Sequence, residues 1–261
     1  MGKDRNGEVI IDVQNVGLTY ETNTKPIKAI EDINLQIKKG EFLCVLGPSG
    51  CGKSTLLKII AGYIKPTTGL CLMQGEPIKG PDWNRGIVFQ SPTLYPWMNV
   101  RKNVEYGPRM RGLPEKDIKS IGRHYLEQVG LIEYGDKATF ELSGGMKQRV
   151  ALARALANEP EVILMDEPFG ALDALTRVNM QTLIRSIWEE TKSTIFMITH
   201  DIDEALSLGT KVVVMSKTPG KILKEFSLDF TYTAIGNKNG RVKVGEEYMK
   251  IKEEIVDKIS Q

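Results

Sequence analysis

The segment GPSGCGKS, from Gly47 to Ser54, constrains the fold of this 261-residue chain more than any other stretch. It fits the pattern G-x-x-x-x-G-K-[ST], and it lies between the apolar run FLCVLG (42–47) and the helical run STLLKIIAG (54–62). Such glycines let backbone N–H groups converge on phosphate oxygens, while Lys53 can reach the β- and γ-phosphates and the Ser54 hydroxyl can bind Mg²⁺. The helix start adds its positive dipole end. The sequence therefore predicts a strand, a phosphate loop (Gly47–Ser54) and a helix in succession.

Three later runs are also almost continuously apolar: VILMD (162–166), TIFMIT (194–199) and KVVVMS (211–216). Such runs are typical of parallel strands that are covered on both faces. Helical patterns separate them, so we expect an α/β core. The interval between residues 47 and 162 is much longer than one crossover helix requires, which predicts an inserted subdomain.

The insertion reads as helical from about 100 to 141, because Ile118, Ile121, Tyr125 and Val129 are spaced to line one helix face. The N-terminal region reads as two antiparallel strands, 9–21 and 27–37, followed by a turn at 38–40. For the last forty residues we expect a short strand pair and then an amphipathic helix near YMKIKEEIVDKIS.

Composition excludes few classes of protein, but it favours a cytoplasmic protein. The 35 Lys and Arg residues nearly balance the 33 Asp and Glu residues, so no strong field attracts nucleic acid or anionic lipid, and we expect no nucleic-acid partner. The three cysteines form neither an even disulfide framework nor a C-x-x-C pair, which fits a reducing compartment. No apolar run approaches the roughly 18 residues of a membrane span, so we do not expect the chain itself to cross a membrane.

Two further segments carry residues that suit phosphate chemistry. In VILMDEP, Asp166 at the strand end can hold Mg²⁺ through water, and the adjacent Glu167 can polarise an attacking water. In LSGGMKQRVALARALA, Ser143 and two glycines open a helix and form a second anion site. Taken alone, that second segment could be an ordinary helix cap; beside the phosphate loop, it suggests two half-sites that a dimer brings together.

The order of these motifs, with Gln90, FGALD and His200, resembles the ATP-binding subunits of ABC transporters over essentially the whole chain. The sequence LMDEPFGALDALTR, followed by ITHDIDEAL, is similar to the sequences of the nitrate, sulfonate and taurine importer branch. The resemblance implies a P-loop NTPase fold of the α/β class, with a RecA-like parallel-sheet core, an N-terminal antiparallel β subdomain and an inserted α-helical subdomain. It implies a single domain over 1–261: a core with the β subdomain at about 1–91 and 160–225, a helical subdomain at about 92–158, and a C-terminal extension at about 226–261.

The resemblance also implies roles for individual residues. Glu167, Gln90 and His200 would be catalytic, while Ser54, Gln90 and Asp166 would hold Mg²⁺. Tyr20 would stack on adenine, although it could equally be a tyrosine at the rim of the site. The residues implied to contact ATP are Tyr20, Gly47, Pro48, Ser49, Gly50, Cys51, Gly52, Lys53, Ser54, Thr55, Ser143, Gly144, Gly145 and Asp173.

In that family two copies bind head to tail around ATP, so the resemblance implies an ATP-dependent homodimer with Asp173 at its seam. It implies further a transmembrane permease subunit, a periplasmic or lipid-anchored solute-binding protein, and a peripheral position on the cytoplasmic face of a bacterial membrane. The expected activity is ATP hydrolysis that drives uptake of a small anion of the sulfonate, taurine or nitrate type. The alternatives are an ABC ATPase of another importer or exporter branch, a non-transport ABC ATPase, or a nucleotide-sensing module in which Glu167 is dispensable.

The segment SPTLYPWMNV, Ser91 to Val100, carries unusual apolar surface for a loop, because Pro92 and Pro96 forbid a regular helix or central strand. In the family, the corresponding loop helps to form a groove for a short helix of the permease, and exposed apolar anchors suit such a groove. We therefore expect docking near Leu94, Tyr95, Trp97 and Met98. Alternatively, Leu94 and Trp97 pack into the core of the helical subdomain itself.

Overall fold

The computed structural model describes residues 7–22, 25–235 and 242–260. The chain forms two compact units: the first comprises Met1–Pro81 and Lys192–Gln261, and the second comprises Asp82–Thr191. Within the described residues, no helix combines the length and the apolarity that a membrane span requires.

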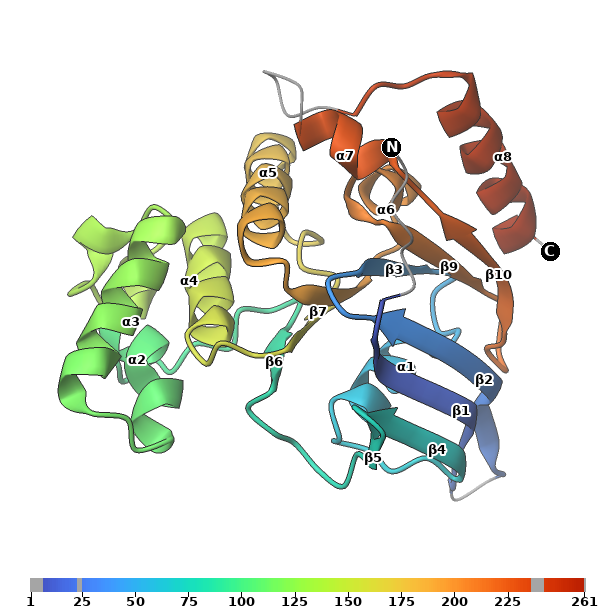
Figure 1. The fold of residues 1–261 in the computed structure, drawn as a ribbon, viewed down its shortest axis with the longest axis horizontal. Helices are drawn as coiled ribbons and strands as arrows, with labels where there is room; N and C mark the ends of the chain where they lie inside the picture. The colour runs from blue at the N-terminus through green and yellow to red at the C-terminus, as the bar shows by residue number, and fades with distance from the viewer. Residues whose placement is uncertain (1–6, 23–24, 236–241, 261) are drawn as a thin grey trace. The chain divides into compact units, whose positions relative to one another are not determined.

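The first unit contains a four-stranded sheet with the order β2-β1-β4-β5 (Figure 1). Strands β1 (Val9–Tyr20) and β2 (Ile27–Lys38) are antiparallel, as predicted, and Glu41 N–H closes the expected turn by donating to Lys38 O at 3.0 Å. The strands β4 (Thr68–Met73) and β5 (Glu76–Pro77) extend the sheet. Alternate residues of β2 from Ile33 to Ile37 are buried, so one face of this sheet covers the core.

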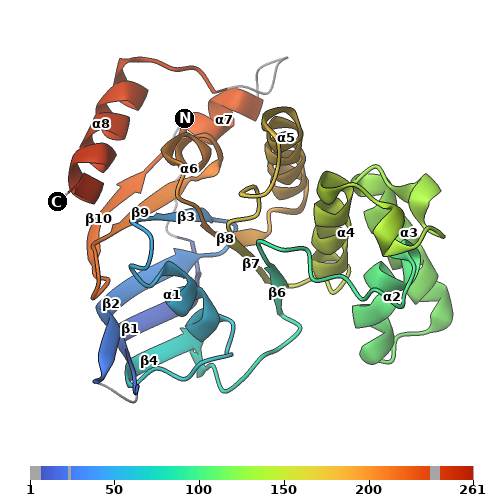
Figure 2. The same ribbon diagram turned by 180° about the vertical axis from the view of Figure 1, so that it is seen from behind.

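The same unit contains the apolar parallel strands β3 (Phe42–Leu46), β8 (Thr194–Ile198) and β9 (Lys211–Met215). Strand β3 pairs in parallel with both β8 and β9, which confirms the prediction for these three runs. Every residue of β3 and β8 is buried, as expected for strands covered on both faces. Helix α1 (Lys53–Ile60) packs beside β8 and α6 (Ile202–Leu208) beside β3 (Figure 2).

The C-terminal region differs from the predicted strand pair. Strand β10 (Ile222–Ser227) pairs antiparallel with β9, and helix α7 (Phe230–Ile235) follows it where a second strand was expected. Helix α8 (Glu246–Ser260) confirms the predicted amphipathic helix, since Tyr248 and Ile255 are buried while most of its other side chains are at least partly exposed. The local pattern indicated a strand at β10, but pairing with β9 satisfies its backbone groups, so no second strand is required.

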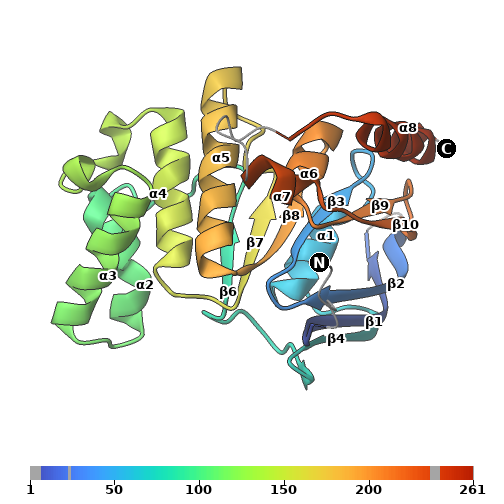
Figure 3. The same cartoon turned by 45° about the horizontal axis from the view of Figure 1, so that its top comes forward.

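In the second unit, strands β6 (Arg85–Val88) and β7 (Val162–Asp166) pair in parallel. Between them, α2 (Val100–Met110), α3 (Glu115–Gln128) and α4 (Gly144–Leu156) pack against one another (Figure 3). The short 3₁₀ turns η1 (Ile132–Tyr134) and η2 (Thr139–Glu141) lie between α3 and α4. Helix α5 (Ala174–Thr191) follows β7. Ile118 and Tyr125 on α3 and Val129 at its end are buried, and Ile121 is half-buried, so the helical face predicted for the insertion is the one that packs.

Candidate nucleotide site

The phosphate loop adopts a conformation that only glycine takes without strain at two positions. Gly50 has φ 76° and Gly52 has φ 99°. A Cβ on Gly52 would lie 2.3 Å from Ile30 Cγ2, whereas a Cβ on Gly50 would meet nothing within 4 Å. Gly52 is therefore required by packing against β2, while Gly50 leaves open space above the loop. Gly52 is also the N-cap of α1, so no side chain caps the amide groups at the start of this helix.

Contacts from the turn after β9 hold the loop from the other side. Thr218 Oγ1 donates to Gly50 O at 2.8 Å, and a Cβ on Gly220 would lie 2.0 Å from Cys51 O. The Cys51 side chain is buried, with a relative exposure of 1%. These contacts fix the loop before any ligand binds, which lowers the conformational entropy lost on binding.

Lys53 is buried, although it carries a charge. Its Nζ donates to Gly47 O at 2.7 Å and to Pro48 O at 2.9 Å. Both acceptors are backbone carbonyls of the phosphate loop, so the ammonium group lies within the loop and is partly desolvated. A phosphate oxygen would replace neutral acceptors by a charged one, and a hydrogen bond between charged groups is the stronger kind.

Tyr20 and His200 lie in the same unit, and both are exposed. Tyr20 ends β1 with 40% relative exposure, and its hydroxyl lies 3.3 Å from Thr55 Oγ1 on α1. His200 follows β8, between Thr199 and Asp201. Its ring is thus presented at the carboxyl end of a parallel strand, where open α/β sheets bind ligands.

The backbone on either side of His200 is tied by short hydrogen bonds. Thr199 Oγ1 donates to Glu204 Oε2 at 2.6 Å and accepts from Asp201 N–H at 3.1 Å, and Asp201 Oδ1 accepts from Glu204 N–H at 3.1 Å. Asp201 is accordingly the N-cap of α6. These bonds restrict the movement of the His200 backbone, while its side chain stays accessible.

In the second unit, Asp166 and Glu167 lie at the end of β7, and both are half-buried. Glu167 has φ 46°, a left-handed conformation that is uncommon for a residue other than glycine and occurs often at functional sites. A Cβ on Gly170 would lie 3.2 Å from Gln90 Nε2 and 3.8 Å from Glu167 Oε2. The structure therefore gathers Gln90 and Glu167 around Gly170, which has no side chain to separate them.

Gln148, which the sequence analysis did not single out, links α4 to this site. Its side chain is buried, and its Nε2 donates to Phe89 O at 3.1 Å, immediately before Gln90. The sequence signal that could have identified Gln148 was a glutamine on the otherwise apolar buried face of a helix. The hydrogen bond fixes the backbone that carries Gln90 to the helix that Ser143 opens.

The segment Leu142–Met146 forms the start of α4, as predicted. Ser143 is the N-cap, and its Oγ accepts from Met146 N–H at 3.3 Å. A Cβ on Gly145 would lie 2.5 Å from Thr176 Cγ2, so the start of α4 lies close to the start of α5. Ser143 and Gly144 are exposed, and a Cβ on Gly144 would meet nothing within 4 Å. This helix end is therefore open to a ligand or to another molecule.

Asp173 caps the neighbouring helix α5. Its Oδ1 accepts from Thr176 N–H at 3.0 Å and from Leu175 N–H at 3.1 Å. The hydrogen bonds from Thr176, together with that from Leu175, hold the pKa of the exposed Asp173 carboxyl below its usual value. Asp173 is therefore ionised at neutral pH at the start of α5, the helix whose Thr176 lies near Gly145.

The side chains expected to hold Mg²⁺ are the hydroxyl of Ser54, the amide of Gln90 and the carboxylate of Asp166. All three offer oxygen donors, which suit a small hard cation that also binds substrate phosphates. Among the described residues, no group of three or more His, Cys, Asp or Glu residues could hold a metal ion. Mg²⁺ commonly binds through one or two carboxylates, with water and substrate phosphates completing its coordination, so the single carboxylate of Asp166 and the oxygen chemistry of the other two donors suit it.

The loop Ser91–Val100, which we call the docking loop after the role predicted for it, is held by hydrogen bonds although it lacks regular structure as far as Asn99, the residue before α2. Tyr95 N–H donates to Asn103 Oδ1 at 2.8 Å, and Asn103 Nδ2 donates to the carbonyls of Tyr95, Met98 and Asn99. Arg154 Nη1 donates to Thr93 O at 2.8 Å, and its guanidinium lies 5.2 Å from the centre of the Tyr95 ring. Helices α2 and α4 thus determine the shape of this loop.

This arrangement leaves Trp97 on the surface. Trp97 is 75% exposed, while Leu94, Tyr95 and Met98 are half-buried. Tyr95 packs between the two other rings, with its centre 4.7 Å from that of Tyr106 and 5.5 Å from that of Trp97. Trp97 therefore does not pack into the core of the helical subdomain, which was the alternative interpretation of this loop.

A phosphate loop between a buried parallel strand and a helix defines a P-loop nucleotide-binding protein of the α/β class. Comparison with known proteins then gives the family: residues 30–170 match the family model described as "ABC transporter". The chain is 49% identical over 250 residues to the taurine import ATP-binding protein TauB of Roseobacter denitrificans, covering 95% of this chain and 93% of that protein. It is 44% identical to TauB of Pseudomonas aeruginosa PAO1, covering 93% and 92%.

Comparison with solved structures indicates the same family. The dimeric ATP-binding cassette MJ0796 in a post-hydrolysis state, bound to ADP and Pi, is 33% identical with a TM-score of 0.74, covering 84% of this chain and 99% of that one. CbiO1 of Clostridium perfringens, part of an ABC transporter complex, is 31% identical with a TM-score of 0.76, covering 89% and 92%. The chain therefore belongs to the ABC transporter family, as an ATP-binding, ATP-hydrolysing cassette. The predicted family, P-loop fold and ATPase activity are confirmed.

Proposed function

We propose that this chain hydrolyses ATP to drive the import of taurine or a closely related small sulfonate. The prediction of an importer ATPase for a small anion agrees with the relatives, which include several taurine import ATP-binding proteins aligned over more than nine-tenths of the chain. The single observation that carries the activity is the formed phosphate loop with Lys53 inside it. The identity of the substrate is the more specific part of the proposal, since in such transporters the solute-binding protein and the permease select the solute.

The proposed ATP contacts come from the family resemblance, and the chemistry of the residues suits them. The phosphate loop with Lys53 and Thr55 binds the phosphates, and Tyr20 stacks on adenine, supported by its exposed ring at the end of β1. Ser54, Gln90 and Asp166 hold Mg²⁺, which neutralises phosphate charge when bound. Glu167 polarises the attacking water, while Gln90 and His200 orient water and γ-phosphate. We propose that the whole chain acts as one ATP-binding domain.

Two copies would complete each site. Ser143, Gly144 and Gly145 of one copy would bind the γ-phosphate held by the phosphate loop of the other, with Asp173 at the seam. The exposed start of α4 and the dimeric state of the related cassette MJ0796 support this arrangement. ATP would stabilise the closed dimer by its greater affinity for that state, and hydrolysis would release it.

The chain would act with a transmembrane permease and a solute-binding protein, at the cytoplasmic face of a bacterial membrane. The permease would contact the docking loop at Leu94, Tyr95, Trp97 and Met98. Support comes from Trp97, an exposed aromatic side chain on a loop that Asn103 and Arg154 hold in place. A large rigid aromatic group on a fixed support is typical of the residues that dominate binding energy at interfaces.

The test of the ATPase proposal is the solution mass of Glu167→Gln, measured by light scattering with and without MgATP. The variant should bind ATP but hydrolyse it at least a hundredfold more slowly, so the closed dimer should accumulate and the mass should double. Glu161→Gln, a change of a partly exposed acid just before β7, is the matched control and should keep wild-type hydrolysis. Unchanged hydrolysis in Glu167→Gln would contradict the proposed role of Glu167 in polarising the attacking water.

The substrate is tested with the reconstituted transporter. Taurine in the presence of its binding protein should stimulate ATP hydrolysis, and Glu167→Gln should abolish labelled taurine uptake. Nitrate and alkanesulfonates provide the comparison. Stimulation by nitrate but not taurine would reject the proposed substrate while leaving the importer ATPase intact.

A further inference from the structure

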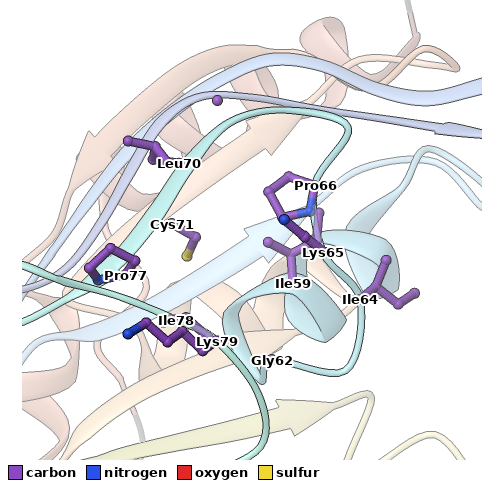
Figure 4. Close-up of a pocket in the computed structure, with 11 residues that line it drawn as sticks. Ile59, Gly62, Ile64, Lys65, Pro66, Leu70, Cys71, Pro77, Ile78 and Lys79 are labelled. Carbon is purple, nitrogen blue, oxygen red and sulfur yellow. The ribbon is translucent and has the colours of Figure 1, made fainter.

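The first unit contains a cavity of about 450 Å³ that is separate from the phosphate loop. The C-terminal turn of α1, the segment after it, β4 and the residues around β5 enclose it. Figure 4 shows the side chains that line it. Helix α1 starts at Lys53 and contributes Ile59 near its other end, so roughly 9 Å of helix separates the phosphate loop from the cavity.

Tight backbone contacts form the walls of this cavity. Gly62 has φ 82°, and a Cβ there would lie 2.2 Å from Gly80 O, so the two chain segments are in direct contact. Ile78 N–H donates to Cys71 O at 2.9 Å, and Ile64 N–H donates to Lys58 O at 3.3 Å. Backbone contacts therefore fix the chain segments that carry the lining side chains.

The lining is apolar with two positive groups. Ile59, Ile64, Leu70, Pro77 and Ile78 contribute apolar surface, and Cys71 lies buried among them. Leu70 is 54% exposed, which is a large exposed fraction for a leucine on a strand. The charged residues of the lining are Lys65 and Lys79, and both are exposed.

We propose that this cavity binds a small amphipathic anion, an apolar chain that ends in one carboxylate or sulfonate. Burial of the ligand's apolar chain against Leu70 and the isoleucines removes apolar surface from water, and its acid group can pair with the ammonium group of Lys65 or of Lys79. The volume lies within the range of about 300–1,000 Å³ typical of small-molecule sites. This site goes beyond the proposed function, because it requires neither ATP nor a transporter partner.

Calorimetry with the full chain and decanoate tests the proposal. Decanoate should bind with a stoichiometry of one. Decanol should bind at least tenfold more weakly because it lacks the negative charge, and acetate should not bind because it lacks the long alkyl group. Saturating MgATP should leave the decanoate affinity unchanged within about twofold, which separates this site from the phosphate loop. Displacement of decanoate by MgATP would overturn the proposal.

Charge reversal at the cavity provides the matched comparison. The double change Lys65→Glu/Lys79→Glu should weaken decanoate binding at least tenfold, whereas Lys250→Glu, at an exposed lysine of α8, should not. Hydrogen exchange should show decanoate protecting the peptides that contain residues 59–66 and 70–79. Equal affinity of the double variant and wild type, or protection confined to other peptides, would show that decanoate merely adsorbs to apolar surface and would overturn the assignment.

Discussion

Asn103 and Tyr95 form a reciprocal pair of hydrogen bonds between a buried side chain and a loop backbone. Tyr95 N–H donates to Asn103 Oδ1 at 2.8 Å, and Asn103 Nδ2 donates back to Tyr95 O at 3.2 Å. Asn103 has no exposed surface, and the loop backbone that it bonds is part-buried, so loss of its side chain would leave these backbone groups with limited access to water as a replacement partner. The pair explains how a loop interrupted by two prolines keeps a defined shape.

Replacement of Asn103 by Ala should therefore destabilise the protein by about 1–3 kcal/mol, because part-buried polar backbone groups lose their partner. Urea unfolding measures the change. Trp97→Ala is the comparison: the side chain is 75% exposed, so its loss should cost less than about 0.5 kcal/mol while weakening binding to the permease. A large stability loss in Trp97→Ala, with permease binding intact, would contradict the docking role.

Ser143→Ala removes the N-cap of α4 and should cost about 0.5–2 kcal/mol. Asn99 caps α2 in the same way, accepting from Lys102 N–H at 2.8 Å, so Asn99→Ala is a matched loss of one cap. The two variants should be similarly destabilised. Only Ser143→Ala, introduced into Glu167→Gln, should reduce the ATP-dependent doubling of mass; an equal reduction by Asn99→Ala would indicate a general effect of stability.

Lys53→Ala should lower ATP affinity about 10–100-fold, which corresponds to the loss of charge-assisted hydrogen bonds worth about 1.5–3 kcal/mol. Lys58→Ala removes an exposed lysine from the same helix and should leave the affinity within about twofold of wild type. Titration calorimetry with ATP measures both. If Lys53→Ala binds ATP as tightly as wild type does, the Lys53 ammonium group of the wild-type protein remains bonded to the loop carbonyls after ATP binds.

Glu105 is a buried acid on α2 whose ionisation opposes folding. Burial raises the pKa of its carboxyl, and the ion pair with Arg109 at 3.6 Å does not offset this. Because the folded pKa exceeds the unfolded value of about 4.5, wild-type stability should fall as pH rises from 4.5 through the folded pKa. Glu105→Gln should therefore be more stable than wild type at pH 7–8.

That advantage should disappear near pH 4, where the carboxyl of wild type is protonated in both states. Arg109 keeps a partner in the variant, since its Nη1 lies 2.8 Å from Glu115 Oε2. Denaturant unfolding of both proteins across this pH range is the measurement. A variant that is less stable than wild type at pH 7–8 would show that the Arg109 pair outweighs the cost of burial.

Asp203 should hold helix α8 in place only while it is ionised. It accepts from Tyr248 Oη at 2.8 Å and from Lys252 Nζ at 2.8 Å. Burial acts to raise the pKa of Asp203, but these hydrogen bonds and the Lys252 charge outweigh it and leave the pKa below the usual 3.8. The contribution is therefore fully present above pH 3.8 and is lost as pH falls through the folded pKa.

Asp203→Asn should accordingly speed hydrogen exchange in 246–260 at pH 7. Asp257→Asn, which changes an exposed acid on the same helix, is the control. If α8 exchanges equally in both variants, the Asp203 contacts do not retain the helix, and its other contacts, the packing of Tyr248 and Ile255 and the Lys224–Glu254 ion pair, do.

The motifs and the main strands were predictable from the sequence, because their signals are local. The phosphate loop was predicted from glycine spacing and its flanking strand and helix, and Ser143 was correctly placed at a helix start. Continuous apolar runs predicted β3, β7, β8 and β9, since strands covered on both faces carry no polar alternation. The roles of Gln90 and His200 came from family resemblance alone, because neither residue has a local signal of its own.

Tertiary structure decided what depends on residues that are distant in the chain. Whether Trp97 is buried or exposed was left open by the sequence, and the contacts of Asn103 and Arg154 with the docking loop decided it. The pairing of β10 with β9, the bond from Gln148 to Phe89, and the cavity beneath Leu70 likewise depend on packing between separate elements. Local patterns state which face of an element is apolar, but they do not state which distant group will cover it or satisfy its hydrogen bonds.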